Sequence, residues 1–268
     1  MTRMVLVVIV LLGGQAFEVA SVRPSAPLSR RVPTLVPRVP SQFVAMNWSI
    51  RTYVAFAYGI AGPGRTTDRV RGGDPAVLEQ RFDITATYPP DIVIPVSEDD
   101  QRTLVRALLV DRFGLRAHVE REVLPAAVLR RASDTLGPQM RPLDRDCGTW
   151  RWTGGVMPTD AAGEPLCPSR GAPVSSVAMQ VGASSDMAFL IRMLQPYVMR
   201  PLVDETGLAG SFAWIVTFNA APERTTVRQS PHPELAVALR EQLGLELVST
   251  SAEVDVVVID AVSEPEPN

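Results

Sequence analysis

The chain has 268 residues, of which 46% are hydrophobic and 21% charged, so it is long enough for one or two domains and is not disordered throughout. The net charge is −3 and no basic stripe stands out, so the composition gives no indication of nucleic-acid binding. The 26 basic residues are all arginine. The lack of lysine excludes a Schiff-base lysine, a P-loop lysine and a Ser-x-x-Lys hydrolase.

The first segment has the pattern of a secretory signal peptide. Arg3 precedes the apolar run Met4–Leu12, and Gly14 and Ala16 place small residues at the −3 and −1 positions of a cleavage site. The run is less than half of the roughly 20 residues that a membrane-spanning helix needs, which disfavours an anchor. We therefore expect residues 1–16 to be removed. The mature protein would be exported to the periplasm or the cell exterior, without a membrane span.

The segment 17–131 predicts a first α+β lobe. Its apolar periodicity favours strands near 17–22, 43–46, 82–88, 115–121 and 123–131, and helices near 49–60 and 97–113. Asn47 is the expected cap of the first helix. Ser97 opens the second helix in a capping box, and Gly114 follows it where a left-handed C-cap is needed.

The segment 132–173 is rich in proline and glycine, and we expect it to be a linker that carries a disulfide loop. Cys147 and Cys167 are the only cysteines, and in an oxidising compartment they can pair. Closing a loop of about 20 residues would contribute roughly 3 kcal/mol. Free thiols or half of a metal site are the alternatives, but a zinc site needs more ligands and only His118 and His232 are available.

Trp150 and Trp152 flank Arg151 inside this loop. Tryptophan is costly to leave in water and is enriched at binding hot spots, so the pair is a candidate binding surface. The alternative is that both rings fold back onto a lobe as a local core.

The segment 174–262 repeats the pattern as a second lobe, and 263–268 is an acidic, proline-rich tail that we expect to be disordered. Strands are expected near 176–181 and 212–218 and as a final pair ending at 254–262. One helix would be capped by Ser184 or Ser185, and another would start at Ser230 and end at Gly244.

A shift of 130 residues aligns the two lobes. The identical pairs are Phe82 with Phe212, Thr87 with Thr217, Leu109 with Leu239, Gly114 with Gly244, Leu115 with Leu245, and Val128 with Val258. We therefore predict an α+β fold made by internal duplication. Each lobe would run strand–helix–strand–helix–strand–strand, with its helices packed on a small mixed β-sheet.

Five segments of the chain form a recognisable set: Phe17–Ser25, Gly72–Ile84, Leu104–His118, Pro201–Phe212 and Ala238–Asp260. Together they resemble an exported family of soil bacteria, largely acidobacterial, called domain of unknown function 3738. Asp74 and the pair Ala213-Trp214 depart from the usual family pattern. The resemblance implies export and a two-part layout, and it implies no activity. The resemblance also implies that some members are fused behind membrane metallopeptidases of the beta-lactam-sensor type, which indicates an extracytoplasmic sensing or binding role.

No catalytic constellation stands out. His118 alternates with exposed strand positions, His232 lies at a helix start, and Gly182–Asp186 lacks the final glycine of a nucleophile elbow. We expect no metal and no cofactor.

The sequence therefore favours a non-enzymatic binding or sensing module of the cell envelope, whose partner is an envelope protein or peptide. One alternative is an unrecognised extracytoplasmic hydrolase that uses Ser184, Asp204 and His118. The other is a structural envelope protein. No oligomeric state is indicated.

Overall fold

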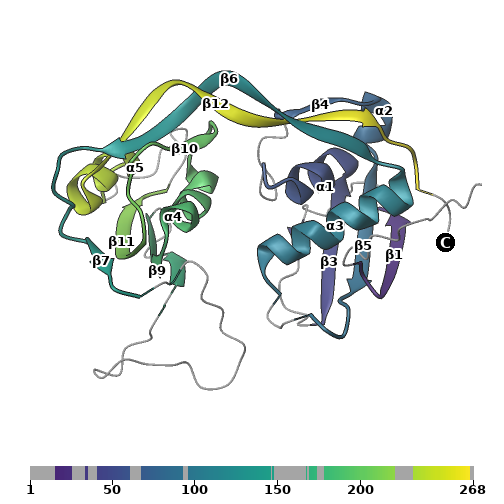
Figure 1. Ribbon diagram of the computed structural model, residues 1–268, viewed down its shortest axis with the longest axis horizontal. Helices are drawn as coiled ribbons and strands as arrows, with labels where there is room; N and C mark the ends of the chain where they lie inside the picture. Colours follow the sequence, from purple (N-terminus) through teal and green to yellow (C-terminus); the bar gives the residue numbers. More distant parts are fainter. Residues whose placement is uncertain are drawn as a thin grey trace, which may run out of the picture. The chain divides into compact units, whose positions relative to one another are not determined.

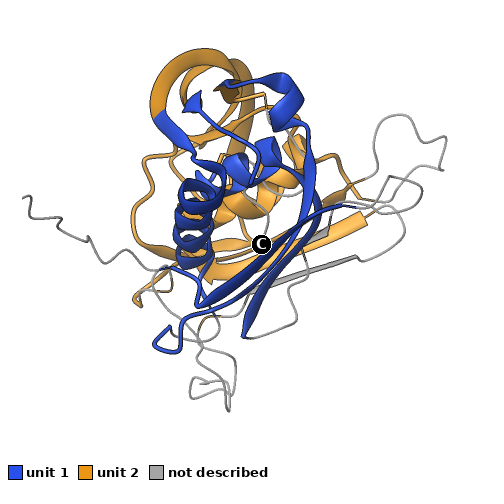
Figure 2. Cartoon of the chain, turned by 90° about the vertical axis from the view of Figure 1, so that its right-hand side faces the viewer, with its two compact units in different colours: residues 1–59, 72–118, 259–268 blue, residues 60–71, 119–258 orange. Residues whose placement is uncertain are grey.

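The computed structural model describes residues 16–25, 34–35, 41–60, 68–92, 96–145, 147, 167, 169–173, 178–220 and 232–265. Helices and antiparallel and mixed sheets occur together in them, which confirms the α+β class (Figure 1). The chain forms two compact units. Unit 1 comprises 1–59, 72–118 and 259–268, and unit 2 comprises 60–71 and 119–258 (Figure 2).

Unit 1 is built on an antiparallel sheet with the strand order β1-β5-β3-β2. The strands are β1 (Val19–Pro24), β2 (Thr34–Leu35), β3 (Gln42–Ser49) and β5 (Arg81–Thr87). Helices α1 (Ile50–Ala57) and α3 (Glu98–Phe113) cover one face of the sheet, and α2 (Pro75–Leu78) is a single turn (Figure 1). Alternate β5 residues, Phe82, Ile84 and Ala86, are buried on that face, as the period-2 pattern predicts.

The helix ends in unit 1 follow local capping chemistry. Ser97 Oγ accepts a hydrogen bond from the Asp100 amide at 3.1 Å, and Gly114 ends α3 with a φ of 57°, so both predicted caps of α3 are confirmed. The predicted cap of α1 is wrong. Ser49 caps that helix, because its Oγ accepts from the Thr52 amide. Asn47 lies instead in β3, at a register shift and with a φ of 59°.

Unit 2 contains an antiparallel sheet with the strand order β7-β11-β9-β8. The strands are β7 (Met140–Leu143), β8 (Ser169–Pro173), β9 (Ala178–Ser185) and β11 (Ser211–Asn219). The helices are α4 (Met187–Leu194), the 3-10 turn η1 (Gln195–Tyr197), α5 (Leu235–Ala238) and the π-helical turn η2 (Leu239–Leu243). Apolar residues of α4, α5 and η2 form one core with those of β9 and β11.

Three expectations for this half need correction. Helix α4 is capped by Asp186, whose carboxylate accepts from the Phe189 amide, and Ser184 and Ser185 are the last residues of β9. The next helix begins at Leu235, after residues 221–231 that lie outside the described part. The segment 132–173 is more than a linker, because it supplies β7 and β8, the two outer strands of the sheet.

A third sheet has the order β10-β6-β12-β4, with β4 (Val70–Gly72), β6 (Arg116–Arg131), β10 (Leu202–Asp204) and β12 (Leu245–Ala261). In each half, the two strands expected after the helix are one long strand. No turn-forming residue separates 115–121 from 123–131, so the extended chain continues.

The long strands also explain why the units differ from the lobes expected at 17–131 and 174–262. Strand β6 begins in unit 1 and ends in unit 2, whereas β12 begins in unit 2 and ends in unit 1. Each unit is therefore completed by a strand end from the other half of the chain.

Replacing Gly114 by alanine should lower the free energy of unfolding by about 1–2 kcal/mol, because its left-handed φ strains any residue with a Cβ. Gly244→Ala should cost more. Gly244 shares that conformation, and an added Cβ would lie 2.6 Å from the Gly137 backbone nitrogen. Gly207→Ala is the matched control, with a φ of 67° and no atom within 4 Å of an added Cβ. Urea unfolding followed by circular dichroism measures all three, and equal losses at Gly114 and Gly244 would contradict the packing argument.

Candidate functional site

A cavity of about 450 Å³ opens in unit 1 between the start of β1 and the last turns of α3. Residues 16–20 form one wall, and the other is formed by Ala107, Leu108, Asp111 and Arg112. The aromatic ring of Phe17 and the buried side chain of Leu108 give the cavity an apolar interior. The charged groups Glu18 and Asp111 lie exposed at its rim.

The chain leaves this space open for two reasons. Ala20 and Ala107, on the two walls, have side chains too short to fill it. Strand β1 is also an outer strand of its sheet, so no further described strand lies beyond it. An open apolar hollow at a sheet edge is the kind of place where proteins take apolar side chains of ligands.

The wall formed by residues 16–20 is held in place by aromatic contacts. The ring of Phe17 lies 5.9 Å from that of Phe43 and 5.8 Å from that of Tyr88, measured between centroids. Burial raises the pKa of Tyr88 to about 12, so its phenol is neutral at ordinary pH. At the rim, the exposed side chains of Asp111 and Arg112 form an ion pair, with 3.0 Å between Oδ2 and Nε.

Unit 1 holds a second cluster of interest, which is polar and is made by Tyr58, Arg106, His118 and Asp260. Nδ1 of His118 lies 3.0 Å from Oδ2 of Asp260. The Tyr58 hydroxyl donates to the Ala117 carbonyl at 3.3 Å, and the Arg106 guanidinium lies 4.4 Å from the centre of the Tyr58 ring. Burial raises the pKa of Tyr58, Arg106 lowers it, and Asp260 raises it further.

This second cluster is better explained as a surface pairing than as a catalytic centre. The side chains of His118 and Asp260 are 49% and 50% exposed, so water screens their interaction, which is worth at most about 1 kcal/mol. His118 is solvent-facing, as its alternation along the strand predicts. Sequence reasoning missed Asp260 as its partner, because the two meet only through strands that are far apart in the chain.

The three residues considered for a hydrolase have separate partners. Ser184 lies in β9 opposite Ala213 of β11 and is buried. The carboxylate of Asp204 accepts from the Thr206 amide at 2.9 Å, which closes a local turn. His118 belongs to unit 1 and has Asp260 as its carboxylate. The geometry therefore gives no support to a Ser-His-Asp triad.

His232, the other histidine, is half-buried just before α5. Within the described residues no group of three or more His, Cys, Asp or Glu side chains could hold a metal ion.

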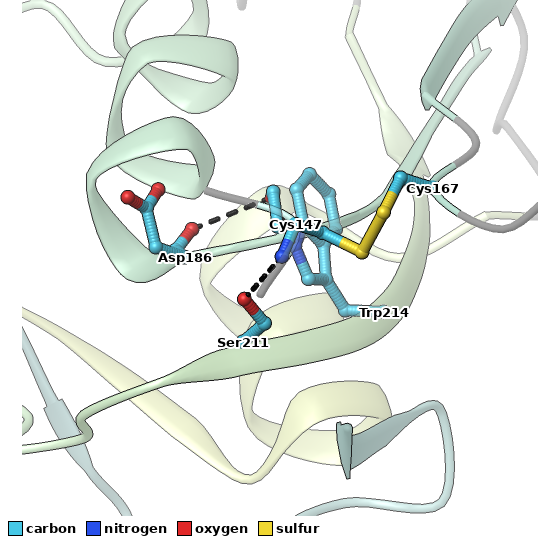
Figure 3. Close-up of a disulfide and its surroundings, with 6 residues drawn as sticks. Cys147, Cys167, Asp186, Ser211 and Trp214 are labelled. Carbon is cyan, nitrogen blue, oxygen red and sulfur yellow. Dashed lines mark hydrogen bonds between the residues drawn. A yellow bond between two sulfur atoms is a disulfide. The ribbon is translucent and has the colours of Figure 1, made fainter. Parts of the chain in front are cut away.

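Cys147 and Cys167 form a disulfide with a Cα–Cα distance of 5.6 Å, the pairing predicted from the sequence (Figure 3). Both residues are buried. The Cys147 amide donates to Ser211 Oγ at 2.9 Å, and Trp214 Nε1 donates to Ser185 Oγ at 3.3 Å beside it. The bridge is thus anchored to the start of β11. Trp150 and Trp152 lie outside the described residues, so a binding role for them stays a prediction.

Removing the bridge with Cys147→Ser together with Cys167→Ser should lower stability by no more than about 3 kcal/mol, the loop-closure contribution of a 20-residue separation. Unit 2 should still fold, because its core is formed by α4, α5, β9 and β11. Thermal unfolding of the oxidised and the double-serine proteins measures the difference. Thiol titration of the denatured protein is the companion experiment, and two free thiols would contradict the bridge.

Comparison with known proteins places the chain in a family. No match is found among curated proteins, and none among solved structures. Among the described residues, no helix combines the length and the apolar character needed to cross a membrane. One family model matches residues 51–262, most of the chain. The chain therefore belongs to the family described as protein of unknown function (DUF3738).

Proposed function

We propose that this protein is an exported, non-enzymatic binding module of the cell envelope and that its ligand enters the cavity between β1 and α3. The observation on which this proposal rests is the cavity itself, which has an apolar interior and a charged rim. Its described lining contains no serine, cysteine or histidine, so no nucleophile–base pair faces a ligand there. Such a site suits recognition of an apolar side chain.

Three observations support export. The segment 1–16 has the charge, apolar run and small residues of a signal peptide. The buried disulfide suits an oxidising compartment. Phe17, the expected first residue of the mature chain, contacts the aromatic core of unit 1 through Phe43 and Tyr88. Cleavage after Ala16 would keep these contacts, but it would remove Ala16 from the wall of the cavity and place the α-amino group of Phe17 there.

We also propose that the two halves arose by duplication. The sheet orders β1-β5-β3-β2 and β7-β11-β9-β8 correspond strand by strand. Pro24 of β1 lies opposite Phe82, and Pro142 of β7 lies opposite Phe212, which is 130 residues further along the chain.

The junction after the second helix supports the same proposal. Gly114 and Gly244 both end their helices in the left-handed conformation, and the buried residues Leu115 and Leu245 follow them. A long strand starts directly afterwards in each half. The shared sheet order, strand register and helix–strand junction are the observations that support the duplication proposal.

Export predicts a defined N-terminus. When the full chain is produced in a bacterium with a secretion pathway, the periplasmic or medium fraction should contain protein that begins at Phe17. Intact-mass spectrometry and N-terminal sequencing measure this directly. Protein that keeps Met4–Leu12, or that stays in the cytoplasm, would contradict the export proposal.

Filling the cavity should abolish binding of envelope components. Ala107→Trp places a large ring into the space, whereas Val110→Trp adds the same ring at an exposed α3 position that does not line it. We expect immobilised Val110→Trp and wild-type protein to retain the same proteins or peptides from an envelope extract, and Ala107→Trp to lose them. Melting temperatures check that both variants fold. Identical retention by all three proteins would overturn the cavity as the binding site.

A further inference from the structure

We infer that the segment 1–16 is removed before unit 1 folds, so that the chain reaches the peptidase that cleaves it in an unfolded form. The inference rests on the proposed export, and it goes further by fixing the order of cleavage and folding. Its basis is the way in which the residues after the expected cleavage site are built into the sheet and into the cavity wall.

The first residues of the mature chain have fixed contacts in the fold. The ring of Phe17 lies 5.9 Å from that of Phe43 and 5.8 Å from that of Tyr88, measured between centroids. The Glu18 amide donates to the Thr87 carbonyl at 3.0 Å. From the next residue on, β1 pairs with β5 along its whole length. The chain is therefore held in place from the first residue after the expected cleavage site.

The peptide bond between Ala16 and Phe17 lies on the wall of the cavity. Ala16 is exposed, so a small molecule can reach this bond, but a peptidase needs more than access. An enzyme that recognises an extended segment binds its backbone groups and takes its side chains into pockets. In the folded chain these groups are already engaged, because the Phe17 ring contacts its aromatic partners and the Glu18 amide is bonded to β5.

Cleavage of the folded chain would therefore require local opening. The Phe17 ring would have to leave Phe43 and Tyr88, and the hydrogen bond between the Glu18 amide and the Thr87 carbonyl would have to break. A bond that is cut only in such an open form is cut at a rate reduced by the fraction of time for which the form is open. An unfolded chain has no such penalty, so cleavage is fast before folding and slow after it.

The disulfide suits the same order. Cys147 and Cys167 are buried and lie in unit 2. Because disulfides form in oxidising compartments, a chain that folded before export would have to bury these two residues as thiols. A chain that crosses the membrane unfolded can form the bridge while it folds.

The order has a consequence for the cavity. Once the bond is cleaved, the α-amino group of Phe17 belongs to the cavity wall, where the other charged groups of the lining are Glu18, Asp111 and Arg112. Its positive charge would balance the lining, which otherwise has one more negative than positive group. Unit 1 would then fold with this group in place, and the proposed binding site would reach its final form only in the processed chain.

The experiment measures cleavage by a purified signal peptidase in mild detergent. The folded precursor, with its disulfide formed, is compared with a synthetic peptide of residues 1–25, which contains the same site without the fold. We expect the folded precursor to be cleaved at least about tenfold more slowly than the peptide. Hydrogen exchange of the Glu18 amide in the same precursor measures the opening independently, and its protection should match the reduction in rate.

Two tyrosine variants test whether the contacts of Phe17 cause the slow cleavage. Tyr88→Ala removes a ring that contacts Phe17, so it should speed cleavage of the folded precursor by about twofold to tenfold. Tyr197→Ala is the matched control, because its ring contacts Phe218 in unit 2, and it should leave the rate unchanged. Circular dichroism checks that both variants fold. The comparison of the wild-type precursor with the peptide decides the order even if Tyr88→Ala does not fold.

Other outcomes would overturn the inference. Equal rates for the folded precursor and the peptide would show that the bond is cleavable in the folded chain. Equal acceleration by the two variants would show that the contacts of Phe17 do not limit cleavage. A peptide that is not cleaved between Ala16 and Phe17 would count against the proposed export signal itself. Secreted protein that begins at Phe17, together with rapid cleavage of the folded precursor, would keep export and reject only the order.

Discussion

The abrupt end of two helices is the constraint on which the rest of this structure depends. Gly114 and Gly244 adopt the left-handed conformation that only glycine takes without strain, so each helix stops within one residue. The next residue, Leu115 or Leu245, is already buried at the head of a long strand. If the helices frayed gradually, the residue at which each long strand starts would not be fixed. The point at which each strand passes into the other unit would then not be fixed either.

Strand exchange follows from the length of these strands. Strands of 16 and 17 residues are far longer than the five or six residues usual in globular proteins, and neither is contained in one unit. Each unit then depends on a segment from the other half to finish its fold. Ser263 shows this at the residue level, because its amide and hydroxyl both donate to the Phe113 carbonyl at the end of α3. The C-terminal segment thus caps a helix formed much earlier in the chain.

Features that depend on interactions between neighbouring residues could be predicted from the sequence. Features that depend on pairing between distant segments could not. Ser97, Gly114 and the alternation in β5 act over a few residues, so their roles can be read directly. The sequence places the cap of α1 at Asn47, two residues before the true cap Ser49, because asparagine is an equally good cap by type and only the irregularity in β3 places Asn47 elsewhere. The strands within 132–173 and the cavity depend on partners distant in the chain, which no local pattern encodes.

The cavity follows from the side chains on its two walls and from the position of β1 at the outside of its sheet. The carbonyl end of the second helix is covered by the chain's own backbone in both units. The Gly137 amide donates to the Leu243 carbonyl in unit 2, and the Ser263 amide donates to the Phe113 carbonyl in unit 1. The space that stays open in unit 1 lies beside α3, where the side chains of Ala20 and Ala107 are too short to fill it. These apolar walls at an open edge are the feature on which the proposed binding role rests, because a ligand's apolar side chain gains most where short side chains leave such a space unfilled.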